Sequence, residues 1–287
     1  MPIVYLNGAF LPLEKAAVSP LDRGFMFGDG VYEVIPVYRR QPFRLPEHLD
    51  RLEHSLRGIR LPPPLSHDDW HSVLNELVRR NDGDNQSIYL QITRGVAPRD
   101  HSFPIDCPPT VFAMSTPIPD TGSTPSRTGV GAITLEDIRW QHCDLKTIAL
   151  LPNILLRQQA IEAGATEAIL VRDGQVTEGA ASNVFCVASG ILITPPKGPR
   201  LLPGITRDLI VELAAMHDIA CREQTITTEL LASADEIWLT SSTKEIVPVV
   251  RLNGNPVGQG TPGPLWSRMD RLYQEFKRQV HAGTSPP

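Results

Sequence analysis

A stretch rich in proline, glycine and hydroxyl residues divides this chain before its midpoint. Residues 117–126 read Pro-Ile-Pro-Asp-Thr-Gly-Ser-Thr-Pro-Ser, which offers little to bury and several turn formers. A chain of 287 residues is also long for a single small core. We therefore predict a small N-terminal domain at 1–118, a linker at 119–126 and a larger C-terminal domain at 127–287.

Short strands and hairpins outnumber helices on both sides of this linker. Asn7-Gly8 predicts a tight hairpin turn. Residues 87–94 alternate apolar and polar side chains, as a half-buried strand does. Ser66, followed three residues later by Asp69, predicts the start of a helix. Because strands and helices do not alternate regularly, we predict an α+β fold rather than a regular βαβ sheet.

The composition excludes several classes of partner. Apolar residues make up 41% and charged residues 21% of the chain, as in globular proteins. A net charge of -5 gives no reason to expect a nucleic acid or an anionic membrane as partner. The first residues show no signal peptide, and the four cysteines lie too far apart for a zinc framework, so we expect a cytoplasmic protein without a metal site.

Lys146 is the candidate for amine chemistry. It is one of five lysines, and it is followed closely by the apolar run 148–151. Partial desolvation would lower the pKa of its ammonium group, and Schiff-base chemistry needs the neutral amine. The competing interpretation is a surface lysine whose stem covers apolar surface. The position of Lys146 alone favours that second interpretation.

Three places could bind an anion. Gly204 leads into a helix with an apolar stripe, and the exposed N–H groups at the start of that helix could bind phosphate. Alternatively, this is an ordinary glycine turn in which Thr206 caps the helix. Residues 240–243 are four hydroxyl residues at a strand end, which could equally satisfy the backbone of a loop. Arg51 lies off the apolar stripe of its predicted helix, so its default position is in solvent.

Two further sites carry charge. Arg99 and His101 lie at i and i+2 in one loop and could converge on a carboxylate, although a solvated basic loop fits the same residues. Glu178 ends a strand before the small residues 179–182. It is by default an exposed acid, and the alternative is a carboxylate held against a nitrogen base.

The order of these segments resembles the fold-type-IV family of pyridoxal-phosphate enzymes almost from end to end. Within that family, the segment 93–104, Thr-Arg-Gly-Val-Ala-Pro-Arg-Asp-His-Ser-Phe-Pro, is similar to the D-amino-acid aminotransferases. The resemblance implies a sandwich-like N-terminal domain and a β-barrel-like C-terminal domain with flanking helices. The matching segments are Asp22 to Glu33, His48 to Leu52, Asp137 to Lys146, Thr177 to Phe185 and Gly204 to Arg207.

The resemblance also assigns roles. Lys146 would bind pyridoxal 5'-phosphate covalently, Glu178 would pair with the pyridine nitrogen, and Leu202 would pack against the ring. The phosphate would be held by Arg51, Ile205, Thr206 and Ser242. The substrate carboxylate would be bound by Tyr32, Arg99 and His101, with the loop of the last two coming from the second subunit of a homodimer.

The implied reaction is ping-pong transamination between a D-amino acid, such as D-alanine, and 2-oxoglutarate. The alternatives are an L-branched-chain-amino-acid aminotransferase, an amine transaminase, an aminodeoxychorismate lyase, or a cofactor-binding protein without catalysis. The chain departs from the family pattern at Pro36, where we expect a sheet edge or a bulge, and at Ala180-Ala181, which replace two serines. Both departures concern substrate preference rather than the cofactor.

Overall fold

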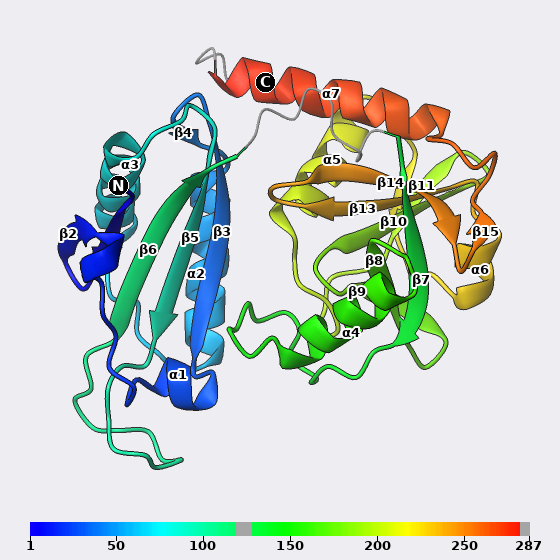
Figure 1. Ribbon diagram of the computed structural model, residues 1–287. Coiled ribbons are helices and arrows are strands. Elements are labelled where there is room, and N and C mark those ends of the chain that lie inside the picture. Colours follow the sequence, from blue (N-terminus) through cyan, green and yellow to red (C-terminus); the bar gives the residue numbers. More distant parts are fainter. Residues whose placement is uncertain (119–127, 282–287) are drawn as a thin grey trace. The chain divides into compact units, whose positions relative to one another are not determined.

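The computed structural model describes residues 1–118 and 128–281 (Figure 1). They pack as two compact units. The first consists of Met1–Asp120 with Leu145–Leu150, and the second of Thr121–Asp144 with Leu151–Pro287. The predicted linker at 119–126 lies outside the described residues, and the predicted domain boundaries stay a prediction. Lys146 and its neighbours group with the first unit, although the expected boundaries put them in the C-terminal domain.

An antiparallel sheet forms the first unit, in the strand order β2-β1-β6-β5-β3-β4. Its strands are β1 (Ile3–Leu6), β2 (Ala9–Pro12), β3 (Gly30–Tyr38), β4 (Gln41–Pro42), β5 (Gln86–Thr93) and β6 (Thr110–Pro117). The turn between β1 and β2 has positive φ at Asn7 and Gly8, as the predicted hairpin requires. A short helix, α1 (Arg23–Phe27), and a 3-10 turn at Leu13–Lys15 precede β3.

Two helices supply the other half of the core of this unit. They are α2 (Leu45–Gly58) and α3 (His67–Arg80), and both pack on the sheet (Figure 1). Ser66 and Asp69 form the predicted capping box at the start of α3. The apolar positions of β5 alternate as predicted, because Ile88, Leu90 and Ile92 are completely buried against the helices.

The open edge of β3 is where the Lys146 segment attaches. β4 covers only Val37 and Tyr38, so the start of β3 has a free side. Leu145–Leu150 pairs with that side: Tyr32 N donates to the carbonyl of Lys146 at 3.0 Å, and Ile148 N donates to the carbonyl of Gly30 at 3.1 Å. Pro36 lies farther along β3 with no break in its register against β5, so of the two expected features the bulge is absent. The sheet edge is present, because β4 covers only Val37 and Tyr38 on the other side of β3.

A larger, curled sheet forms the second unit (Figure 1). Its strands run β12-β11-β10-β13-β14-β7-β8-β9, with β15 on β14. The neighbours β14 and β7, β7 and β8, and β11 and β12 are parallel. The strands are β7 (Val130–Glu136), β8 (Glu167–Arg172), β9 (Gln175–Gly179), β10 (Asn183–Ala188), β11 (Ile191–Thr194), β12 (Cys221–Glu223), β13 (Glu236–Ser241), β14 (Glu245–Leu252) and β15 (Asn255–Pro256).

Four helices flank this sheet: α4 (Leu151–Glu162), α5 (Ile205–Met216), α6 (Thr228–Ala232) and α7 (Pro264–His281). Together the two units confirm the predicted α+β fold. Among the described residues, no helix is long and apolar enough to cross a membrane. The helix expected to start at Thr206 instead starts at Ile205 with Gly204 as its N-cap, so the suggested Thr206 cap is wrong.

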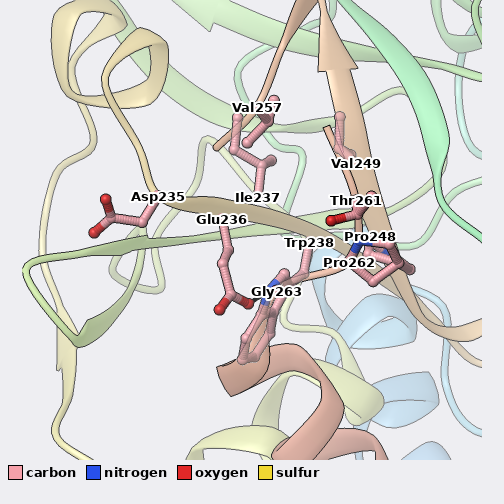
Figure 2. A pocket seen from close by; sticks show the side chains of 10 residues that line it. All are labelled: Asp235, Glu236, Ile237, Trp238, Pro248, Val249, Val257, Thr261, Pro262 and Gly263. Carbon is pink, nitrogen blue, oxygen red and sulfur yellow. Dashed lines mark hydrogen bonds between the residues drawn. The ribbon is translucent and has the colours of Figure 1, made fainter. Parts of the chain in front are cut away.

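A buried carboxylate fixes the start of α7. Glu236 accepts hydrogen bonds from the backbone N–H groups of Leu265 (2.9 Å) and Trp266 (2.8 Å) and from the indole of Trp238 (2.9 Å). Figure 2 shows this carboxylate beside Gly263, among the residues that line a small hollow. Because Glu236 is satisfied by these donors and none of the predicted site residues lines the hollow, we assign it to structure rather than to ligand binding.

Candidate active site

Lys146 is held in place through its backbone. Its N–H donates to the hydroxyl of Ser55 on α2 at 3.0 Å, and its carbonyl accepts from Tyr32 on β3 at 3.0 Å. Its Nζ lies over the ring of Tyr32, 4.2 Å from the centroid. The side chain of Lys146 is half-buried. The structure therefore brings together two of the predicted residues, Lys146 and Tyr32, and adds Ser55, which no local sequence signal marks.

Arg51 belongs to a buried ionic group, so its expected default position in solvent is wrong. Its Nε and Nη2 donate to the two oxygens of Glu33 at 2.8 Å each, and His48 Nδ1 lies 2.8 Å from the same carboxylate. Burial raises the pKa of Glu33, but the charge of Arg51 and the hydrogen bonds from Arg51 and His48 outweigh it and hold that pKa well below its ordinary value. Burial also lowers the pKa of His48, and Lys146 is one of the cations that add to this shift.

Arg99 and His101 lie in the exposed loop between β5 and β6. The guanidinium carbon of Arg99 lies 5.5 Å from the ring centroid of Phe27 on α1, and the ring of His101 lies 5.5 Å from the same ring. The structure therefore brings these two predicted residues together on one aromatic side chain. Tyr32, the third predicted carboxylate ligand, contacts Tyr89 with 5.8 Å between ring centroids.

Glu178 is also buried, so its default assignment as an exposed acid is wrong. Three donors converge on its carboxylate: a guanidinium nitrogen of Arg139, Nδ2 of Asn183 at 3.1 Å and the backbone N–H of Leu202 at 3.1 Å. Asp137 in turn accepts two hydrogen bonds from the side chain of Arg139, both at 2.9 Å. Leu202, predicted to pack on a ring beside Glu178, is thus hydrogen-bonded to that carboxylate.

The electrostatics of Glu178 differ from those of Glu33. Burial raises the pKa of Glu178 to about 7, although Arg139 opposes the shift. Nearby, burial raises the pKa of the Cys143 thiol to about 11, which keeps it protonated and unreactive at neutral pH. A carboxyl group that titrates near neutrality can change its charge when a cation is placed beside it.

The N-terminus of α5 fits a phosphate group. Its cap, Gly204, makes no side-chain capping bond. A side chain at this glycine would collide with Asn183, because a Cβ would lie 1.9 Å from Oδ1. Thr240 is the cross-strand partner of Asn183, and its buried hydroxyl has no hydrogen-bond partner among the described residues. Buried polar groups are normally paired, so this unpaired hydroxyl and the uncapped helix end together suit an anion.

The ten predicted site residues divide equally between the two units. Tyr32, Arg51, Arg99, His101 and Lys146 lie in the first unit, and Glu178, Leu202, Ile205, Thr206 and Ser242 lie in the second. Sequence reasoning missed Glu33 and Arg139. A signal existed for Glu33, because it occupies a core-facing position of β3 between Val31 and Ile35.

Comparison with known proteins decides the family. The sequence profile described as "Amino-transferase class IV" matches residues 30–252. This chain belongs to the class IV aminotransferases. It is 40% identical to a D-alanine aminotransferase of Bacillus licheniformis over 271 residues, or 94% of this chain and 95% of that protein. It is 39% identical to a D-alanine aminotransferase of Staphylococcus haemolyticus over 277 residues, or 96% and 98% of the two chains.

Solved structures of this family confirm the fold. The branched-chain amino acid aminotransferase of Escherichia coli matches with a TM-score of 0.91 at 28% identity, over 99% of this aminotransferase and 96% of that chain. A branched-chain amino acid aminotransferase from T.th., solved with pyridoxamine 5'-phosphate, matches with a TM-score of 0.90 at 28% identity, over 99% and 95% of the two chains.

Proposed function

We propose that this aminotransferase uses pyridoxal 5'-phosphate to transfer the amino group of a D-amino acid, such as D-alanine, to a 2-oxo acid, such as 2-oxoglutarate. The observation that carries the choice of substrate is the pairing of Arg99 and His101 on one ring. The guanidinium of Arg99 and the imidazole of His101 both carry N–H groups, which can donate hydrogen bonds to a substrate carboxylate. The similarity to D-alanine aminotransferases supports the same choice.

The residues present fit this cofactor. The proposed phosphate ligands are Ile205 and Thr206 at the uncapped end of α5, Ser242, and Arg51, whose position Glu33 fixes. We add Thr240, whose buried hydroxyl lacks a partner among the described residues. When bound, pyridoxal phosphate supplies an electron sink that stabilises negative charge at the substrate Cα.

Lys146 and Glu178 have distinct roles in this proposal. The Nζ of Lys146 holds the cofactor covalently, and after its release it moves the Cα proton of the substrate. The carboxylate of Glu178 keeps a proton on the pyridine nitrogen, and Leu202 orients that carboxylate through its backbone N–H. Leu202 also covers one face of the ring, and Tyr32 contributes to substrate binding beside Lys146.

A single-turnover experiment tests the substrate. The loaded protein is incubated with D-alanine, or separately with L-leucine, without any oxo-acid acceptor. We expect about one pyruvate per active site from D-alanine, because a ping-pong enzyme completes its first half-reaction alone. A response to L-leucine alone would favour the branched-chain activity of the structural relatives. No response to either would favour a lyase or a non-catalytic protein.

Substitution of the lysine tests the cofactor site. We expect Lys146→Ala to abolish turnover and the visible absorption band of lysine-bound cofactor. Lys244→Ala is the matched control, because Lys244 is a second lysine whose pKa burial lowers from its ordinary value. Loss of the band in Lys244→Ala with retention in Lys146→Ala would reassign the cofactor lysine.

We further propose that the enzyme works as a cytoplasmic homodimer. Helix α4 buries only Leu156 and Ala160, whereas Leu151 and Ile154 are 65% and 61% exposed. A second copy of the chain would cover this apolar face. We expect Ile154→Glu to shift the sedimentation of the protein towards the monomer. A dimer of unchanged strength in that variant would place the interface elsewhere.

A further inference from the structure

Helix α1 lies directly against the loop that carries Arg99 and His101. The loop spans residues 94–109, and its base is closed where Gly95 approaches Pro108: a Cβ at Gly95 would lie 2.1 Å from the carbonyl oxygen of Pro108. Gly95 also has a φ of +103°, which side-chain-bearing residues rarely adopt. This closure fixes the two ends of the loop. Other contacts must fix its tip, where Arg99 and His101 lie.

Arg23 of α1 supplies one of these contacts. Its Nη1 donates to the backbone carbonyls of Asp100 (2.6 Å) and Ser102 (3.3 Å), the two residues that flank His101. The guanidinium itself cannot easily move, because Arg23 is 4% exposed and its Nε donates to Asp29 at 2.8 Å. Asp29 is in turn fixed by two hydrogen bonds from Arg94, at 2.8 and 3.0 Å.

Phe27 supplies the second contact, which its ring makes with the side chains of Arg99 and His101. Its ring lies 5.5 Å from both Arg99 and His101. Arg23 approaches the same ring at 4.9 Å. Asp100, the acid between Arg99 and His101, accepts a hydrogen bond from the backbone N–H of Ser102 at 2.9 Å. Among the residues that the structure describes, Arg99 and His101 form no ion pair, so both remain available to a ligand carboxylate.

We propose that α1 is a positioning element for substrate specificity: Arg23 fixes the backbone on either side of His101, and the ring of Phe27 sets the spacing of Arg99 and His101. The inference rests on the proposed function, because it assigns these two residues to the substrate carboxylate. Neither Arg23 nor Phe27 is required to touch the substrate. A displacement of the loop by about 1 Å is enough to lower productive binding substantially.

The test uses the cofactor-loaded enzyme and the variants Phe27→Leu, Phe27→Tyr and Arg23→Lys. Phe27→Leu removes the aromatic ring, and Phe27→Tyr keeps it. Arg23→Lys keeps a charge but loses the guanidinium, whose Nε binds Asp29 while its Nη1 binds the two carbonyls. Phe10→Leu is the matched control. It removes a similar arginine–aromatic contact elsewhere in the same unit, since Arg80 lies 4.5 Å from the ring of Phe10.

Two measurements are made on each variant: the KM for D-alanine against kcat, and backbone hydrogen exchange of residues 99–103, which lie between two prolines. We expect Phe27→Leu and Arg23→Lys to raise KM roughly 3- to 10-fold with little change in kcat. We also expect both to accelerate exchange in the loop. Phe27→Tyr should restore both readouts, and Phe10→Leu should change neither.

The two readouts separate failure of this inference from failure of the proposed function. If the wild-type enzyme does not turn over D-alanine, the proposed function fails, while hydrogen exchange still shows whether α1 fixes the loop. If turnover is present, the inference is overturned when Phe27→Leu and Arg23→Lys do not both raise KM and accelerate exchange in the loop. It is also overturned when Phe10→Leu raises KM as much as Phe27→Leu does.

Discussion

Glu178→Gln should remove a pH dependence of stability from the cofactor-free protein. Burial raises the pKa of this carboxyl group from 4.5 to about 7 in the folded chain. Because the folded state has the higher pKa, it binds the proton more tightly than the unfolded chain does. The resulting contribution to stability is fully present below about pH 4.5 and is lost as the pH rises through about 7.

The size of this contribution follows from the two pKa values. A change from 4.5 to about 7 corresponds to roughly 3–4 kcal/mol, at roughly 1.4 kcal/mol for each tenfold change in proton affinity. Between about pH 5 and about pH 8 the linkage relation gives a loss of roughly 2–3 kcal/mol. Glu178 is only 5% exposed, so solvent screening reduces this value little.

The assay is urea unfolding of the wild-type protein and of Glu178→Gln at several pH values from about 5 to about 8. Glutamine keeps the shape but lacks one of the two acceptor oxygens, so it destabilises the protein by an amount that does not depend on pH. The contributions of titrating groups that do not interact with Glu178 cancel in the difference between the two proteins. We expect the stability of the wild type relative to the variant to fall by roughly 2–3 kcal/mol over this range.

A difference that stays constant within about 0.5 kcal/mol would refute the reasoning, because it would mean that Glu178 has the same pKa in both states. Cofactor loading gives a second check. A protonated ring nitrogen beside Glu178 favours the ionised carboxylate, so the loaded wild type should lose less stability on the alkaline side. An unchanged loss after loading would contradict the proposed role of Glu178.

Two further substitutions test the first unit. Arg99→Ala should raise the KM for D-alanine roughly 10- to 100-fold, because a charge-assisted hydrogen bond contributes about 1.5–3 kcal/mol; unchanged steady-state kinetics would exclude Arg99 from carboxylate binding. Glu33→Gln should destabilise the protein by about 3–5 kcal/mol at neutral pH, since it leaves the guanidinium of Arg51 buried without its counter-ion. A change below about 1 kcal/mol in denaturant unfolding would show that the charge of Arg51 is compensated by other groups.

Local signals in the sequence predicted the elements that depend on neighbouring residues. The Asn7-Gly8 turn and the Ser66 capping box formed as expected, because the groups that stabilise them lie within a few residues. The family resemblance supplied the candidate site residues, and four of the ten lie at the ends of helices or strands: Glu178, Ile205, Thr206 and Ser242. Composition and spacing alone favoured none of them.

The burial of the charged residues could not be predicted locally, because their partners are distant in the sequence. Arg51 is buried by Glu33, eighteen residues earlier, and Glu178 by Arg139, thirty-nine residues earlier. A helical or strand pattern places such residues on the polar side by default. Lys146 is a similar case. Its segment pairs with the part of the β3 edge that stays open because β4 is short.

The two buried glutamates have opposite pKa shifts for a reason that the geometry provides. Glu33 faces a guanidinium through two hydrogen bonds and a histidine through a third, so it stays ionised and serves as the permanent counter-ion of Arg51. Glu178 shares Arg139 with Asp137, whose own charge raises the pKa of Glu178 further. Only Glu178 is therefore poised to gain charge when a cation is placed beside it. Environments that separate the pKa values of two like groups also separate their roles: Glu33 holds Arg51, the proposed phosphate ligand, in position, and Glu178 is the carboxylate that we propose responds to the cofactor.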